Sequence, residues 1–106
     1  MSKKINLKYN DTEYTLEFTR RTVQLMESRG FSIADITTKP LNTLPELFKG
    51  AFMANHKGVS DKVVDDIYSQ LGDKEGLIKA LAEMYSEPIM TLLDEPEKNI
   101  KWTMSE

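Results

Sequence analysis

Few side chains in this sequence have the types and spacings that catalysis or metal binding requires. His56 is the only histidine, and there is no cysteine to supply a thiolate nucleophile, a disulfide or a zinc ligand. Asp61, Asp65 and Asp66 gather at the start of a predicted helix, where carboxylates suit the positive end of the helix dipole. A cation site there would need further oxygen ligands. We expect His56 to interact with a helix dipole, and we expect no enzyme activity, metal or cofactor.

The totals describe one small domain. The chain has 106 residues, of which 40% are hydrophobic and 29% are charged, enough for a single core with a well-solvated surface. No apolar run approaches the roughly 18 residues of a membrane span, and the start lacks an apolar signal core. We therefore expect a single domain over residues 1–106, located in the cytoplasm and without a membrane partner.

Charge is divided unevenly along the chain. Residues 1–60 carry 9 Lys and Arg against 6 Asp and Glu, a balance of +3, whereas residues 61–106 carry 5 against 11, a balance of −6. Two ordinary solvated surfaces would account for this division. The alternative is a bipolar particle that assembles head to tail. Neither half resembles the basic face of a nucleic-acid-binding protein.

The N-terminal residues 3–18 predict a β-hairpin. Apolar side chains alternate with polar ones before the turn-forming pair Asn10-Asp11 and again after it, with Ile5, Leu7 and Tyr9 on one side and Tyr14, Leu16 and Phe18 on the other. Because an isolated hairpin is marginally stable in water, it must pack on helices or gain strands.

Residues 19–94 predict a helical core. Thr19 is expected to cap a first helix that Gly30 ends in a Schellman motif, with one helical turn over residues 33–36. A central helix is predicted over residues 44–54, with Pro45 in its first turn and Gly58 as its stop. Gly50 inside this helix suggests that another backbone passes close by.

Two more helices follow in the prediction. Ser60 is expected to cap one that closes at Gly72, and Asp73 to cap the next. An apolar seam continues from Leu77 to Leu93. Pro88 interrupts this seam, so we expect a kink there or a new helix capped by Ser86.

Residues 95–106 predict either a frayed tail or an edge strand. Ile100, Trp102 and Met104 alternate with Lys101 and Thr103. We favour a strand joined to the hairpin, because a tryptophan on a loose tail would expose a large apolar surface. The predicted fold class is therefore α+β, an N-terminal hairpin, with or without a C-terminal third strand, packed on four to five helices.

Candidate partner-binding residues are apolar side chains that fall outside the main stripes, namely Ile33, Ile36, Met53, Ile100, Trp102 and Met104. An exposed sheet edge at residues 4–9 or 100–104 is a further candidate for strand addition. The alternative, which we slightly favour for the off-stripe residues, is that they complete the core.

A succession of short motifs runs through nearly the whole chain after the hairpin. These are T-R-R-T-V at Thr19–Val23, M-E-S-R-G-F at Met26–Phe31, K-P-L at Lys39–Leu41, L-F-K-G-A-F at Leu47–Phe52, N-H-K at Asn55–Lys57, G-D-K-E-G-L at Gly72–Leu77 and E-M-Y-S-E-P at Glu83–Pro88. The succession resembles a family of small prophage proteins of Gram-positive bacteria, grouped with the tail assembly chaperones of long-tailed phages.

The resemblance implies a cytoplasmic helper in the bacterial host cell. Such proteins are thought to coat the tape-measure protein, recruit tail-tube subunits and then leave, and they commonly self-associate. They are often made in two lengths by a ribosomal frameshift, for which the codons of Glu97-Lys98-Asn99 are a candidate. The alternatives are a small structural tail or head–tail completion protein, or a DNA-binding regulator acting through Arg20-Arg21.

Overall fold

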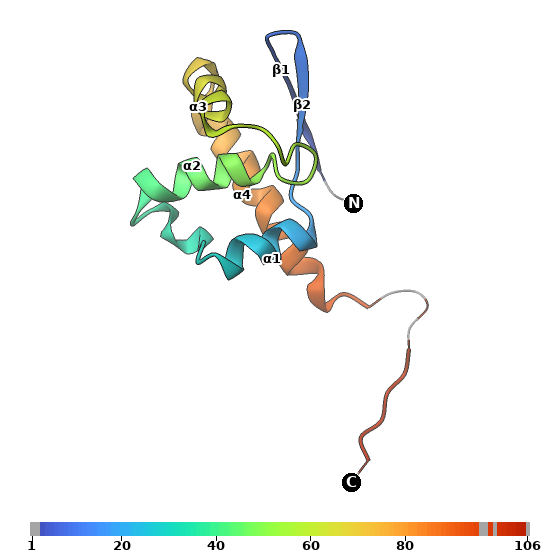
Figure 1. Cartoon of the computed structure of the whole chain (residues 1–106). Helices are drawn as coiled ribbons and strands as arrows, with labels where there is room; N and C mark the ends of the chain where they lie inside the picture. The colour runs from blue at the N-terminus through green and yellow to red at the C-terminus, as the bar shows by residue number, and fades with distance from the viewer. Residues whose placement is uncertain (1–2, 96–97, 99, 106) are drawn as a thin grey trace.

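The computed structural model describes residues 3–95, 98 and 100–105 and has the predicted α+β architecture (Figure 1). Within these residues a hairpin precedes four α-helices, and α4 packs on both α1 and α2. The elements in chain order are β1 (Ile5–Tyr9), β2 (Thr12–Leu16), α1 (Arg20–Ser28), the 3₁₀ turn η1 (Ile33–Ile36), α2 (Pro40–Gly50), α3 (Asp61–Gln70), α4 (Lys74–Met90) and the 3₁₀ turn η2 (Thr91–Leu93).

The hairpin is formed as its alternation predicts. β1 and β2 pair antiparallel from Ile5 opposite Leu16 to Tyr9 opposite Thr12. The connecting residues Asn10 and Asp11 have φ values of 49° and 63°, the left-handed pair that a two-residue type I′ turn requires. Asn and Asp tolerate this conformation better than other non-glycine residues, which explains their place in the turn.

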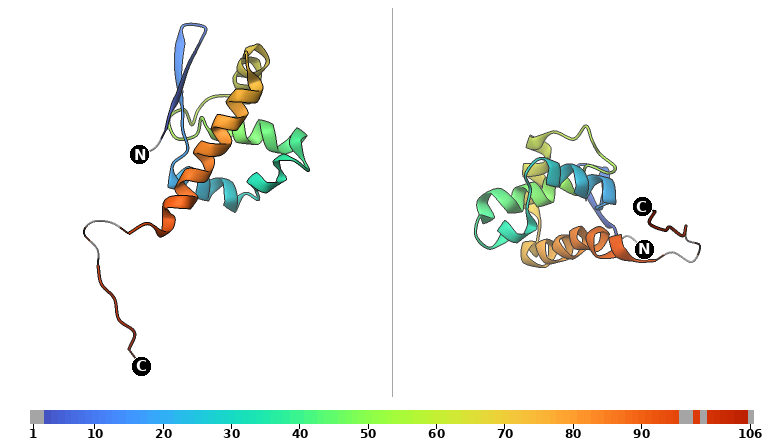
Figure 2. Two further views of the ribbon diagram at one scale, coloured as in Figure 1. Left: turned by 180° about the vertical axis from the view of Figure 1, so that it is seen from behind. Right: turned by 90° about the horizontal axis from the view of Figure 1, so that it is seen from below.

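The predicted third strand is wrong. Residues 100–105 form no strand, and Ile100, Trp102 and Met104 are all exposed. In Figures 1 and 2 this segment leads away from the helices instead of returning to the hairpin. Residues 96, 97, 99 and 106 of the predicted segment lie outside the described residues. The hairpin packs on the helical core instead, which supplies the support that a third strand would have given.

Helix α1 has both predicted ends. The Thr19 hydroxyl accepts from the Thr22 N–H at 3.1 Å, and the Thr22 hydroxyl accepts from the Thr19 N–H at 2.8 Å. At the other end Gly30 has a φ of 92°, and the Phe31 N–H donates to the Met26 carbonyl at 3.0 Å. This bond defines a Schellman motif and directs Phe31 back over the helix.

The central helix α2 differs from the prediction at both ends. It begins at Pro40, whose fixed φ suits a first position, so Pro45 lies inside the helix. It ends at Gly50, and Gly58 lies in the connection to α3. Beyond Gly50 the chain continues in tight turns, with the Met53 N–H donating to the Gly50 carbonyl at 3.1 Å. The apolar spacing therefore continues past the end of the regular helix. Because the prediction followed this spacing, it placed the helix about four residues too far toward the C-terminus.

Helices α3 and α4 have the predicted caps. The Ser60 hydroxyl accepts from the Val63 N–H, and the Asp73 carboxylate accepts from the Gly76 N–H. Of the two alternatives expected at Pro88, the new helix capped by Ser86 is wrong, because α4 continues to Met90 and the Ser86 hydroxyl donates to the Ala82 carbonyl at 3.0 Å. The seam also leaves the core earlier than predicted, since side chains from Ile89 to Leu93 are exposed.

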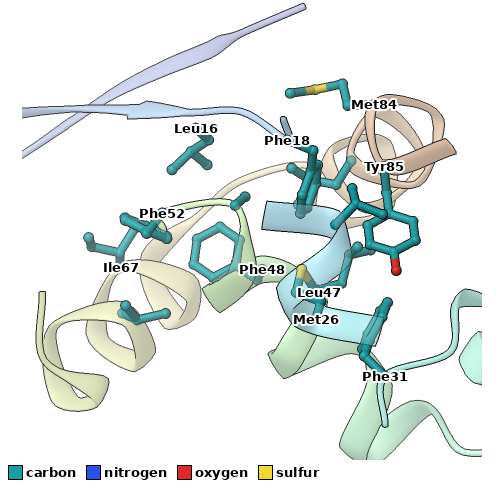
Figure 3. Close-up of a cluster of buried hydrophobic side chains, with 14 residues drawn as sticks. Leu16, Phe18, Met26, Phe31, Leu47, Phe48, Phe52, Ile67, Met84 and Tyr85 are labelled. Atoms are coloured by element: carbon teal, nitrogen blue, oxygen red, sulfur yellow. The ribbon is translucent and has the colours of Figure 1, made fainter. Parts of the chain in front are cut away.

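The core joins aromatic side chains from distant parts of the chain (Figure 3). Tyr85 of α4 meets Phe18 and Phe31 edge to face, with ring centroids 5.3 and 5.2 Å apart. Phe48 and Phe52 form a second such pair at 5.2 Å. Edge-to-face pairs add about 0.5–1.5 kcal/mol to the gain from burial alone. The two pairs of Tyr85 attach the segments that follow β2 and α1 to α4, whereas the Phe48–Phe52 pair lies within α2 and the turn after it.

Candidate protein-binding groove

A groove of about 630 Å³ lies between α1, α2 and the turns that follow each of them. Its floor is apolar, formed by Leu25, Met26, Phe31, Gly50 and Met53. None of its lining residues belongs to the hairpin strands or to α4. The groove therefore opens on a face of α1 and α2 that the rest of the described chain leaves uncovered.

Local structure brings the floor residues together. The Schellman turn places Phe31 against the end of α1. The tight turn after α2 places Met53 on the same groove floor. The Met26 side chain packs against the backbone of Gly50. A Cβ at this position would overlap the Met26 Sδ and Cε atoms, so only glycine leaves room for the contact. The close neighbour expected at Gly50 is thus a side chain, whereas the sequence suggested a backbone. Glycine at this position therefore lets the Met26 side chain of α1 pack directly against α2.

The rim of the groove is basic. Arg21, Arg29, Lys49 and Lys57 line it together with one acid, Glu46. Lys49 pairs with Asp61 of α3. Within the described residues no carboxylate pairs with the other three basic side chains, which are exposed. An apolar floor with unpaired positive charges at its edge suits an amphipathic, acidic polypeptide segment.

The predicted partner-binding residues do not form one site. Met53 is half-buried in the groove. Ile33 and Ile36 lie on η1 and pack against the core, in agreement with the core-completing alternative. Ile100, Trp102 and Met104 lie on the exposed C-terminal segment.

Sequence reasoning missed most of the groove. Arg21, Leu25 and Arg29 recur at intervals of four and share one face of α1. Glu46, Lys49, Met53 and Lys57 follow a similar course along α2 and the turns beyond it. Two stripes of this kind, each mixing basic and apolar residues, are the signal that could have found the groove. What the sequence lacked was the information that the two stripes face each other.

The two edges of the hairpin differ in whether their outward-facing backbone groups have hydrogen-bond partners. On β2 the Thr15 N–H donates to His56 Nε2 at 3.0 Å, and the Thr15 carbonyl accepts from Asn55 Nδ2 at 3.2 Å. Just beyond β2 the Glu17 N–H donates to the Ala51 carbonyl at 3.0 Å. The helix-dipole role expected for His56 is therefore replaced by an acceptor role at the sheet edge.

β1 is the open edge of the hairpin. Backbone groups of an antiparallel strand point alternately toward and away from its partner, so Asn6, which faces Thr15, directs its N–H and C=O away from β2. Among the described residues the sheet has only the two strands, and nothing pairs with β1 on its outer side. Of the two edges predicted as candidates for strand addition, the one at residues 4–9 is thus available.

A second uncovered apolar surface lies at the end of α4. Met90 is 75% exposed and Leu93 is 91% exposed, with Ile89 and Leu92 partly exposed beside them. Asp94 and Glu95 follow directly and are exposed as well. No lysine or arginine occurs between Lys79 and Lys98, so this end of the helix is both apolar and acidic.

The described residues hold no cluster of three or more potential metal ligands. Asp61, the first of the three aspartates considered for a cation, is engaged by Lys49. In the described part of the chain, no helix combines the length and the apolar character needed to cross a bilayer.

Comparison with known proteins gives a family but no function. No curated protein and no solved structure matches the chain. One family model matches residues 1–105, and its description is Domain of unknown function (DUF5055). Since the match spans almost the whole sequence, the chain belongs to the DUF5055 family.

Proposed function

We propose that this protein is a non-enzymatic phage tail assembly chaperone that binds the tape-measure protein and tail-tube subunits in the cytoplasm of the bacterial host. The groove between α1 and α2 is the observation that carries the proposal. Its apolar floor offers burial to a client helix, and its basic rim selects a client with acidic residues beside its apolar stripe. The client identities come from the resemblance of the sequence motifs.

The physical basis is that a long helical protein with an apolar stripe aggregates until its partners cover it. A groove that holds one stretch of such a stripe keeps it in solution, and several copies would cover more of its length. Arg21, Arg29 and Lys57 have no carboxylate partner within the described residues, and exposed charges of this kind favour fast and reversible binding, which suits a helper that must leave. Nucleic acid is not among the proposed ligands, since the chain has a net charge of −3.

Co-expression with the tape-measure protein encoded nearby tests this proposal. The intact chain should move the tape-measure protein from the insoluble to the soluble fraction. The double variant Arg29→Glu/Lys57→Glu reverses two exposed rim charges and should lose this effect. A matched control, Lys62→Glu/Lys79→Glu, makes the same charge change outside the groove and should keep it. A tape-measure protein that stays insoluble, or that both variants solubilise equally well, would contradict the proposal.

A structural tail protein or a head–tail completion protein would also bind tail components. Mass spectrometry of purified particles distinguishes these from a chaperone, which should be absent from the finished particle. A DNA-binding regulator acting through Arg20-Arg21 should instead give a salt-dependent mobility shift. A slippery codon run at residues 97–99 with an overlapping downstream frame would support a second, longer product; residues 97 and 99 lie outside the described residues.

A further inference from the structure

We infer that the groove of one copy binds the acidic end of α4 from a second copy, so that the protein assembles head to tail. The inference uses the groove of the proposed function but does not depend on the identity of its client. The occupant is the segment Ile89–Glu95, which presents Met90 and Leu93 next to Asp94 and Glu95.

The two surfaces match in chemistry. Exposed apolar side chains from Met90 and Leu93 lack cover within the described residues, and the groove floor of Leu25, Met26 and Met53 offers apolar surface. The carboxylates of Asp94 and Glu95 directly follow the apolar residues, while Arg21, Arg29 and Lys57 edge the floor. Insertion of the helix end would therefore bury apolar groups and bring opposite charges together in one step.

The occupant must come from another copy. Tyr85 is 1% exposed and lies between Phe18 and Phe31, so it holds α4 in the core one turn before Ile89. No residue of α4 lines the groove. The end of α4 cannot reach the groove of its own chain without withdrawing Tyr85 from the core.

This geometry makes the contact heterologous. Each copy offers one groove and one helix end, and the two surfaces are different. Such a contact generates a closed ring or an open row of copies, whereas a symmetric contact stops at a dimer. A row or ring would present its members at regular spacing to a long client, and a client helix would compete for the same groove.

Sedimentation of the full chain over a range of concentrations tests the inference. The intact protein should form dimers and larger species whose share rises with concentration and falls with added salt. The groove variant Arg29→Glu/Lys57→Glu and the helix-end variant Met90→Ser/Leu93→Ser should each sediment as a monomer. Circular dichroism should show unchanged helix content, because all four side chains are exposed. The control Lys62→Glu/Lys79→Glu should associate like the intact protein.

Mixing the two monomeric variants gives the sharpest result. The groove variant still has an intact helix end, and the helix-end variant still has an intact groove, so the mixture should form a one-to-one heterodimer and nothing larger. A monomeric intact chain, an association that survives both variants, as pairing through β1 would, or a mixture without a heterodimer would overturn the inference. A monomer that still solubilises the tape-measure protein would refute this inference and leave the proposed function standing.

Discussion

The middle of α4 and the turn that follows the helix carry similar apolar residues in opposite surroundings. Leu81 is 0% exposed and lies in the core, whereas Leu93 in the turn that follows the helix is 91% exposed. The spacing of apolar residues is continuous between them, but the elements that cover the helix are not. Phe18 and Phe31 pack against α4 at Tyr85, whereas the side chains from Ile89 to Leu93 are exposed. Apolar spacing thus reports which side chains favour burial, and only the fold decides whether the same chain buries them.

The largest expected effect is on the free energy of unfolding, and it tests this contrast directly. Leu81→Ala should lower the free energy of unfolding by about 2–5 kcal/mol, because it removes buried methyl groups and leaves a cavity. Leu93→Ala makes the same chemical change at an exposed position and should alter stability by less than about 0.5 kcal/mol. Urea unfolding at low protein concentration, where self-association is absent, measures both. Equal losses in the two variants would show that Leu93 is covered in solution.

Backbone groups of the hairpin show the same contrast, since the edge of β2 is covered and that of β1 is open. His56→Ala should destabilise the protein by about 1–3 kcal/mol, because the Thr15 N–H loses its acceptor in a partly buried place. The neighbouring exposed Lys57→Ala serves as the control and should be nearly neutral. Amide exchange should accelerate at Thr15 in the His56 variant only. Unchanged exchange at Thr15 would contradict the assigned hydrogen bond.

The covered part of α4 also contains a titratable group, Tyr85, which gives the smallest effect. Burial, with a lesser contribution from the charge of Glu27, raises the pKa of Tyr85 above its usual value of about 10. Because the folded pKa exceeds the unfolded one, this contribution to stability is complete below about pH 10 and declines as the pH rises toward the folded pKa. Tyr85→Phe removes it.

The stability difference between the wild-type protein and Tyr85→Phe should therefore shrink as the pH rises beyond about 10. Urea unfolding of both proteins at several pH values measures this difference, and the other tyrosines and the lysines cancel in the subtraction. A difference that stays constant across this range would argue that Tyr85 is accessible to solvent.

Features that depend on a few neighbouring residues are predictable from the sequence. The turn at Asn10-Asp11, the caps at Thr19, Ser60 and Asp73, and the stop at Gly30 are all correct, because each uses side chains and backbone groups within one turn. Helix boundaries were less reliable, since Pro40 and Pro45 both suit a first turn. The apolar spacing favoured Pro45 as the first-turn proline, but this spacing continues into the tight turns after Gly50 and so does not mark the ends of the helix.

Features that depend on distant residues were not predictable. His56 as an acceptor for Thr15 requires the fold that brings the α2–α3 connection to β2. The groove requires the stripes on α1 and α2 to face each other. The third strand failed for a related reason, because Trp102 favours burial but the described chain offers it no partner surface. Sequence patterns state what a segment can do, and distant contacts select among the alternatives.

The hairpin is synthesised before the helices, but its contacts are completed only after them. The backbone of Thr15 forms hydrogen bonds with Asn55 and His56, which are synthesised later. Phe18, just after β2, packs on Tyr85, which is synthesised later still. Until α4 has left the ribosome, Phe18 lacks the ring of Tyr85 to pack against, and a hairpin without its full helical packing is only marginally stable. Folding of this domain is therefore expected to be completed only after α4 has left the ribosome, with nascent chains that stop short of Tyr85 susceptible to proteolysis.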